Sequence, residues 1–203
     1  MFQPNSIHVM VDLETMDLTP TSAILSIGAI KFCPMAAPGK MAHESEPYFP
    51  YGASSTFYQT VNLADSIKRG FSVSGHTITW WMEQNQDVRA NLFTSTNTID
   101  EVLHQFATWY GRNVENVWAG PAGFDIPILE HAFRKLDKLS PWLYSDVRDY
   151  STFRKVAAEL LTETVDYVEP RFKHHALHDA VAQMTHLQKL ARALHHQKFM
   201  AAQ

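Results

Sequence analysis

The sequence predicts a layered α/β domain built on a mixed sheet. Two apolar runs rich in β-branched residues, at 7–13 and 23–32, stand close together near the start of the chain. The polar turn between them is short enough to join an antiparallel pair. Helical segments follow, and a further short apolar run, at 116–120, lies between two of them. Strands followed by helices that are interleaved with another strand are typical of this class.

The other elements follow from local patterns. Residues 33–55 are rich in Pro, Gly, Ala and Ser, which predicts a surface excursion, and the alternation in 56–62 predicts a third strand. Helical periodicity appears in four segments, at 74–93, 98–112, 126–136 and 176–195. Thr98 and Glu101 make a capping box for the second helix. Pro127 is expected in the first turn of the third, where proline is tolerated.

Length and composition favour one ordinary globular domain. The chain has 203 residues, of which 45% are hydrophobic, so we expect a single domain over 1–203. Its net charge of −4 does not indicate a nucleic-acid partner. Such a partner would have to be attracted by local basic residues or by bound cations. Cys33 is the one cysteine, which fits a reducing compartment. With neither a secretory signal nor an apolar run near the ~20 residues of a membrane span, we expect a cytoplasmic protein without a membrane partner.

Two carboxylates interrupt the first apolar run, which reads HVMVDLE from His8 to Glu14. On a strand, Asp12 and Glu14 point to the same side, where their charges repel each other. A divalent cation removes this conflict, because hard cations prefer carboxylate oxygens. The alternative is that the strand is frayed here and that both acids face water.

Two more acids stand at the margins of core elements. Asp125 lies at the start of a helix in GFDIPIL, and Asp179 lies in the first turns of the last helix in HHALHDA. Each has a simpler explanation, as an N-cap or as an acid favoured by the helix dipole. Taken together with the first pair, however, they make four carboxylates, enough to hold two Mg²⁺ or Mn²⁺ ions about 4 Å apart.

These stretches carry a resemblance to a known family. VDLETM, GFD and HHALHDA, in this order and spacing, resemble the three exonuclease motifs of the DEDDh family, the 3′–5′ exonuclease branch of the ribonuclease H-like superfamily. TITWWMEQ at 77–84, RGFSVS before it and DVR at 146–148 resemble compact bacterial and phage exonucleases. The resemblance extends roughly from Ile7 to Leu190. It implies a three-layer α/β/α domain with a mixed, mostly five-stranded central sheet.

The resemblance also implies a function and a set of site residues. It implies a metal-dependent 3′–5′ exonuclease that acts on single-stranded DNA or RNA and releases nucleoside 5′-monophosphates. Thr15 and Met16 would contact the 3′-terminal nucleotide, and His174 would be the general base. Two Mg²⁺ or Mn²⁺ ions would be bound by the four acids, Asp12, Glu14, Asp125 and Asp179.

Several assignments keep alternatives. In a continuous helix the residue one turn before Asp179 is His175, so it rivals His174, which the family places on a loop. Trp80 and Trp81 would point about 100° apart on a helix, so at most one is expected to be purely core and the other to stack on a base. Among the basic residues, Arg171 and Lys173 are the best candidates for phosphate contacts.

The rival functions are of different classes. One is a catalytically silent nucleic-acid-binding or assembly module on the same fold, which the presence of all four acids disfavours. The other is an RNA-specific trimming exoribonuclease, since the motifs do not separate RNA from DNA. A homodimer is a further expectation, because relatives of this size often pair.

Overall fold

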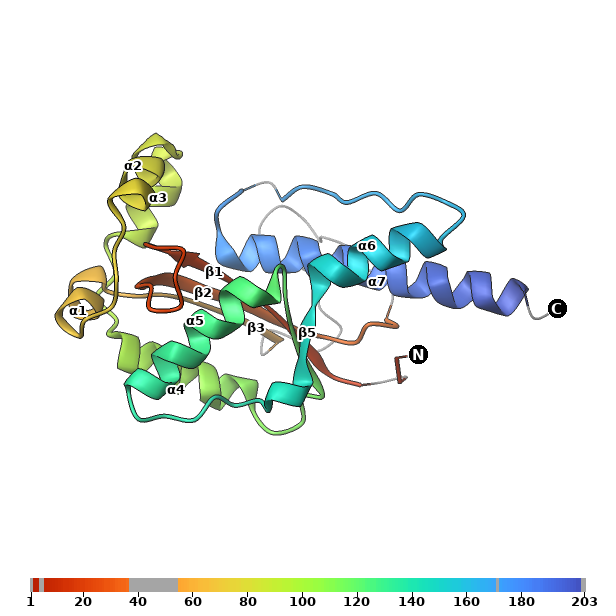
Figure 1. The fold of residues 1–203 in the computed structure, drawn as a ribbon, viewed down its shortest axis with the longest axis horizontal. Coiled ribbons are helices and arrows are strands. Elements are labelled where there is room, and N and C mark those ends of the chain that lie inside the picture. The colour runs from red at the N-terminus through yellow and green to blue at the C-terminus, as the bar shows by residue number, and fades with distance from the viewer. Residues whose placement is uncertain (1, 4–5, 37–54, 171, 202–203) are drawn as a thin grey trace.

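A mixed five-stranded sheet forms the centre of the molecule, here a computed structural model that describes residues 2–3, 6–36, 55–170 and 172–201 (Figure 1). The strands are β1 (His8–Thr15), β2 (Ile24–Phe32), β3 (Thr56–Thr60), β4 (Asn116–Ala119) and β5 (Val147–Asp149). Their order is β3-β2-β1-β4-β5. The first three are antiparallel, and β4 and β5 run parallel to β1. The mixed, five-stranded sheet is therefore confirmed.

Helices cover both faces of this sheet. They are α1 (Leu63–Lys68), α2 (Gly75–Glu83), α3 (Gln86–Leu92), α4 (Ile99–Tyr110), α5 (Ala122–Lys135), α6 (Tyr150–Leu160) and α7 (Ala176–Met200). In Figure 1, α4 and α5 lie on one side of the strands, α6 and α7 lie on the other, and α1 to α3 gather at one end. The three-layer arrangement is confirmed. No helix in the described ranges is both long and apolar enough to cross a membrane.

The alternation of β1 places the site. Val9, Val11 and Leu13 belong to the core shared with α4 and α5, whereas Met10 packs in the core under α7. Because successive side chains of a strand point to opposite faces, Asp12 continues the Met10 side, toward α7. β1 extends to Thr15, so Glu14 is still in strand geometry.

Two predicted helices differ in the structure. The segment 74–93 is two helices, because the chain leaves helical geometry after Glu83 and the side chain of Asn85 accepts the N–H of Asp87 to start α3. The third helix starts earlier than predicted, at Ala122, whose N–H donates to the carboxylate of Asp149 at 2.6 Å. Pro127 was expected in the first turn of this helix. It is instead the sixth residue of α5, in the second turn, so this expectation is wrong.

The residue patterns did not predict α1, β5, α6 or the short 3-10 helix at Tyr144–Asp146. α7 continues five residues beyond the predicted end. Residues 37–54 of the predicted 33–55 excursion lie outside the described residues, and Cys33 before them is buried. The boundaries of a single domain stay a prediction.

Candidate active site

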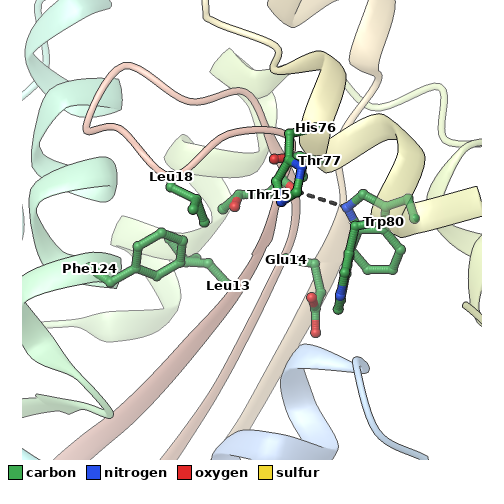
Figure 2. Close-up of a pocket in the computed structure, with 9 residues that line it drawn as sticks. Leu13, Glu14, Thr15, Leu18, His76, Thr77, Trp80 and Phe124 are labelled. Carbon is green, nitrogen blue, oxygen red and sulfur yellow. Dashed lines mark hydrogen bonds between the residues drawn. The ribbon is translucent and has the colours of Figure 1, made fainter. Parts of the chain in front are cut away.

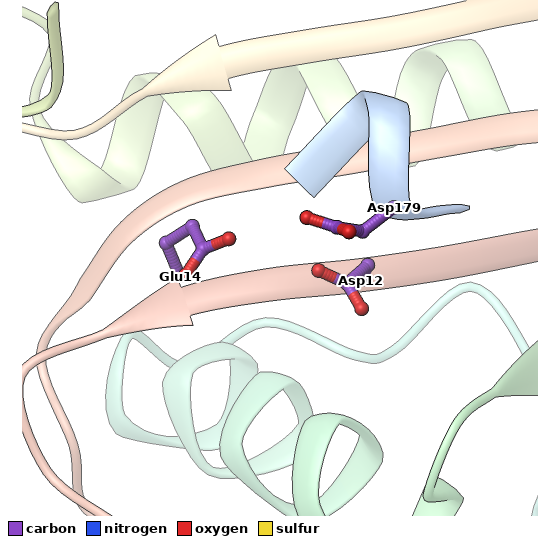
Figure 3. Close-up of side chains that lie close together, drawn as sticks. All are labelled: Asp12, Glu14 and Asp179. Atoms are coloured by element: carbon purple, nitrogen blue, oxygen red, sulfur yellow. The ribbon is translucent and has the colours of Figure 1, made fainter. Parts of the chain in front are cut away.

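Three carboxylates meet where β1 passes beneath the start of α7. Asp12 and Glu14 project from β1 and Asp179 from the first turn of α7 (Figure 3). One ligand oxygen from each lies within 4.8 Å of the others. The frayed-strand alternative is wrong, since both strand residues are paired with β2 and Glu14 is only 7% exposed.

Hydrogen bonds from α7 hold two of these carboxylates. The backbone N–H of His175 donates to Oδ2 of Asp179 at 3.1 Å. One turn along the helix, the side-chain amide of Gln183 donates to Oδ1 of Asp12 at 2.9 Å. Gln183 is missing from the residues expected from sequence, although its spacing of four from Asp179 puts both on one helical face.

Asp125 approaches the cluster from the α5 side. Its Oδ1 accepts the backbone N–H of Leu13 at 3.1 Å, and the residue is only 3% exposed. Asp125 lies in the first turn of α5 without being its N-cap, which is Pro121. Its charge raises the pKa of both Asp12 and Glu14, so it belongs to the same electrostatic unit. It is not among the three carboxylates that converge, and its role as a fourth ligand stays a prediction.

Burial dominates the electrostatics of the site. It raises the pKa of Asp12 and Glu14 well above the usual range, and the charges of the neighbouring carboxylates raise both further. Burial likewise raises the pKa of Asp125 to about 7 and that of Asp179 to about 6. Buried carboxyl groups that repel one another tend to keep their protons, and a divalent cation that binds them displaces these protons.

The donor set fits a hard divalent cation. All three converging ligands are carboxylates, and oxygen donors suit Mg²⁺ and Mn²⁺ rather than the softer metals that favour thiolate. Gln183 supplies the kind of outer hydrogen bond that orients a ligating carboxylate.

The two neighbouring histidines point to different surroundings. His174 has φ 62°, which places it on the loop before α7, and its ring meets Trp80 edge-on at 4.8 Å between centroids. His175 is the N-cap of α7, and its ring stacks on Tyr58 at 4.1 Å. Burial lowers the pKa of His174, helped by Lys173, and lowers that of His175 to about 4. The loop position expected for His174 is confirmed.

A cavity of about 300 Å³ opens beside Glu14 (Figure 2). Its wall is largely apolar and aromatic, made by Leu13, Glu14, Thr15, Leu18, His76, Thr77, Trp80, Trp81 and Phe124. Trp81 is buried and its Nε1 donates to the carbonyl of Thr15 at 2.9 Å, whereas Trp80 is 37% exposed. The expectation that the two tryptophans divide between core and surface is confirmed. Sequence reasoning gave no role to Leu18, His76 or Phe124, and it noted Thr77 only as the first residue of TITWWMEQ.

The remaining predicted contacts divide. Thr15 lines the cavity, and its hydroxyl donates to the carbonyl of Asp17. Met16 does not line this cavity: it is 2% exposed and packs in the core shared with α4 and α5, so its predicted contact with a base lacks support. Lys173 pairs with Glu169 at 3.0 Å on the surface, and Arg171 lies outside the described residues.

The mixed five-stranded sheet with helices on both faces has the fold of ribonuclease H-like exonucleases, and the buried acidic cluster lies on its central strand. Residues 7–191 match the family described as the 3′-5′ exoribonuclease Rv2179c-like domain. The chain belongs to this family. The resemblance to DEDDh exonucleases is confirmed. No curated protein sequence matches the chain.

Solved structures show the same fold. The nuclease domain of 3′hExo, a DEDDh family member bound to rAMP, has a TM-score of 0.56 and 13% identity over 92% of both chains. Exonuclease I from Methylocaldum szegediense has a TM-score of 0.59 and 14% identity over 92% of this chain, which spans 42% of that protein. Cell-death related nuclease 4 has a TM-score of 0.56 and 11% identity over 92% of this chain, which spans 64% of that one.

Proposed function

We propose that this protein removes nucleotides one at a time from the 3′ end of single-stranded RNA and releases nucleoside 5′-monophosphates. One observation carries the proposal: Glu14 belongs both to the acidic cluster and to the wall of the aromatic cavity. A 3′-terminal nucleotide seated in the cavity therefore has its phosphodiester beside the carboxylates. RNA is favoured because the family is described as exoribonucleases and because the 3′hExo domain was solved with rAMP.

Each group of the site has a part in this reaction. Asp12, Glu14, Asp125 and Asp179 would hold two divalent cations, Mg²⁺ or Mn²⁺, which when bound stabilise the charge that develops at phosphorus during in-line displacement. Trp80 and Phe124 offer faces for the terminal base. The buried Trp81 fixes the backbone at Thr15 through its hydrogen bond.

His174 is the general base in this proposal. Its lowered pKa keeps the ring neutral near pH 7, so that a ring nitrogen can accept a proton from the attacking water. Oxygen from that water forms the new bond to phosphorus while the bond from phosphorus to the 3′ oxygen of the preceding nucleotide breaks. His175 is disfavoured, because its ring is stacked on Tyr58. The homodimer and the cytoplasmic location stay predictions of the sequence.

The test uses 5′-labelled single-stranded RNA and DNA of one sequence, with Mg²⁺, with Mn²⁺ or with a chelator. We expect a ladder that shortens from the 3′ end, faster on RNA, and absent with the chelator. Asp12→Asn should abolish it, whereas Asp137→Asn, which removes an equal charge at an exposed site, should not. Intact RNA in the presence of folded wild-type protein and metal would refute the proposal.

A further inference from the structure

A second cavity, of about 340 Å³, lies between α6, the segment 161–167 and α7. Its wall combines cationic, hydroxyl and aromatic side chains, among them Arg154, Lys155, Thr162, Thr164, Tyr167 and His186. These residues differ from those that line the cavity at Glu14. In Figure 1 the start of α7 lies between α2, which borders the first cavity, and α6, which borders the second.

The floor of the second cavity is connected to the acidic cluster. Tyr150 donates to or accepts from Nδ1 of His186 at 2.7 Å, and a Cβ on Gly120 would lie 2.7 Å from both the ring of Tyr150 and the side chain of Gln183. Gln183 in turn donates to Asp12. Gly120 therefore lies close to both Tyr150, the partner of His186, and Gln183, the partner of Asp12.

Tyr167 lines the second cavity and is close enough to the carboxylates to feel their charge. Burial raises its pKa to about 12 with further contributions from the charges of Asp179, Glu169 and Asp12. Its ring meets that of His186 at 5.5 Å. Among the residues that the structure describes, its hydroxyl has no hydrogen-bond partner, so it remains available to a ligand.

Two cationic side chains line the second cavity. Arg154 and Lys155 are consecutive and exposed on α6. Within the described part of the chain, no carboxylate lies at ion-pair distance from either one, although the acid Glu163 also lines the cavity. In a protein of net charge −4, two unpaired cations at one rim favour an anionic ligand there.

We propose that this cavity binds the part of the RNA strand that lies 5′ of the scissile phosphodiester, with Arg154 and Lys155 contacting backbone phosphates. The assignment rests on the proposed function, in which the 3′-terminal nucleotide occupies the cavity at Glu14. From there the strand would cross the carboxylates toward α6, where the second cavity carries cationic side chains. The face of Tyr167 gives an upstream base or ribose a surface to pack on.

The test compares two RNA substrates. A dinucleotide with a 5′ hydroxyl has only the scissile phosphate and cannot reach a phosphate site upstream, whereas a decamer can. The double variant Arg154→Ala/Lys155→Ala should lower kcat/KM on the decamer about tenfold and reduce the slope of log(kcat/KM) against log[salt] by about 1.4, because each phosphate contact on a single strand contributes about 0.7. The dinucleotide should be cleaved at the wild-type rate.

The control variant is Arg112→Ala/Arg134→Ala, which removes the same charge from exposed positions at the ends of α4 and α5, on the other face of the sheet, and should change neither substrate. An unchanged decamer with the double variant overturns the site. Equal losses on decamer and dinucleotide overturn it as well, since they place the effect at the catalytic centre or in the fold. If the wild type cleaves neither substrate in Mg²⁺, the proposed function fails, and this strand site fails with it.

Discussion

Gly28 of β2 lies directly against Ala176, the first residue of α7. A Cβ built on Gly28 would be 2.1 Å from the carbonyl carbon of Ala176, far closer than a non-bonded contact allows. Gly28 is also the partner of Asp12 across the β1–β2 ladder. The lack of a side chain at this position therefore lets α7 begin on the sheet beside Asp12, and this close approach brings Asp179 to the cluster.

Gly28→Ala should separate the two halves of the acidic site. The new methyl group meets backbone atoms, so α7 must shift or the sheet must bend, at a cost of about 1–3 kcal/mol in the free energy of unfolding. Displacing Asp179 by an ångström should lower kcat/KM about 100-fold. Urea unfolding and a single-nucleotide release assay measure the two effects.

Gly75→Ala is the matched control for this prediction. Gly75 is the first residue of α2, and a Cβ there meets nothing within 4 Å. Alanine is the better helix former, so this variant should keep its activity and lose no stability. If Gly28→Ala behaves like the control, the close packing of α7 on β2 does not position the site.

Gln183→Leu should weaken metal binding. The variant removes the amide that orients Asp12 while keeping an apolar side chain of similar size, and loss of such an outer partner typically costs about 10–100-fold in metal affinity. Titration with Mn²⁺, followed by calorimetry, gives the affinity without relying on turnover.

Gln188 provides the comparison on the same helix. It is also buried, at 4% exposed, but its amide donates to the carbonyl of Cys33 at 2.9 Å, away from the carboxylates. Gln188→Leu should lower the melting temperature without changing the affinity for Mn²⁺. Equal affinities of the two variants would count against a positioning role for Gln183.

The sequence predicts the central parts of this fold because their signals are local. The strand at Asp12, the capping box at Thr98 and the last helix all follow from side-chain periodicity within one element. α6 was missed, because its exposed face is broad and its start depends on a distant contact. Asp149 caps α6 at Thr152 and also accepts the N–H of Ala122, which starts α5.

The candidate site was predicted only in part, for a related reason. Asp12 and Glu14 share a face by strand geometry alone. Their meeting with Asp179 depends on the packing at Gly28, and the contribution of Gln183 depends on which face of α7 lies on the sheet; neither is a property of one element. The core position of Met16 is likewise set by the layer of helices behind β1.

Without metal, the stability of the protein should fall as the pH rises through neutrality. Burial raises the pKa of Asp125 to about 7 and that of Asp179 to about 6, so the folded state holds protons that the unfolded chain has released above about pH 4. A group whose pKa is raised in the folded state contributes its full stability below its pKa in the unfolded chain. This contribution is lost as the pH rises through its pKa in the folded protein. Melting temperatures in chelator from pH 6.5 to 8 should therefore decrease.

Two buried histidines also change the stability of the protein at lower pH, so the effect of the acids has to be isolated. Burial lowers the pKa of His8 and His175 to about 4, so these groups favour unfolding as the pH falls below about 6.5 and oppose the carboxylate trend there. Asp12→Asn isolates the acids: it should melt higher than wild type at pH 8 in chelator and show a shallower slope. Saturating Mg²⁺ should remove the wild-type slope. Parallel curves for the two proteins would contradict a repulsive cluster.

Variants of His174 and His175 should differ in kcat and in its pH dependence. His174→Asn suits the left-handed backbone at φ 62° and removes the base, which should lower kcat by about 100- to 10,000-fold and abolish the acidic limb of log kcat against pH. His175→Phe retains a ring to stack on Tyr58 and should keep kcat within about threefold. The reverse ranking would make His175 the base.

Trp80→Ala should raise KM far more than it lowers kcat. The ring is 37% exposed and lines the cavity beside Glu14, so part of it is open to the terminal base. Loss of one stacking contact costs about 1–3 kcal/mol, an increase in KM of roughly 5- to 150-fold. Trp80→Phe should recover most of this loss, since it keeps an aromatic face.

The control for this prediction lies on the same helix. Ile78→Ala, at an exposed position that does not line the cavity, should leave KM unchanged. A wild-type KM for Trp80→Ala would show that the terminal base binds elsewhere.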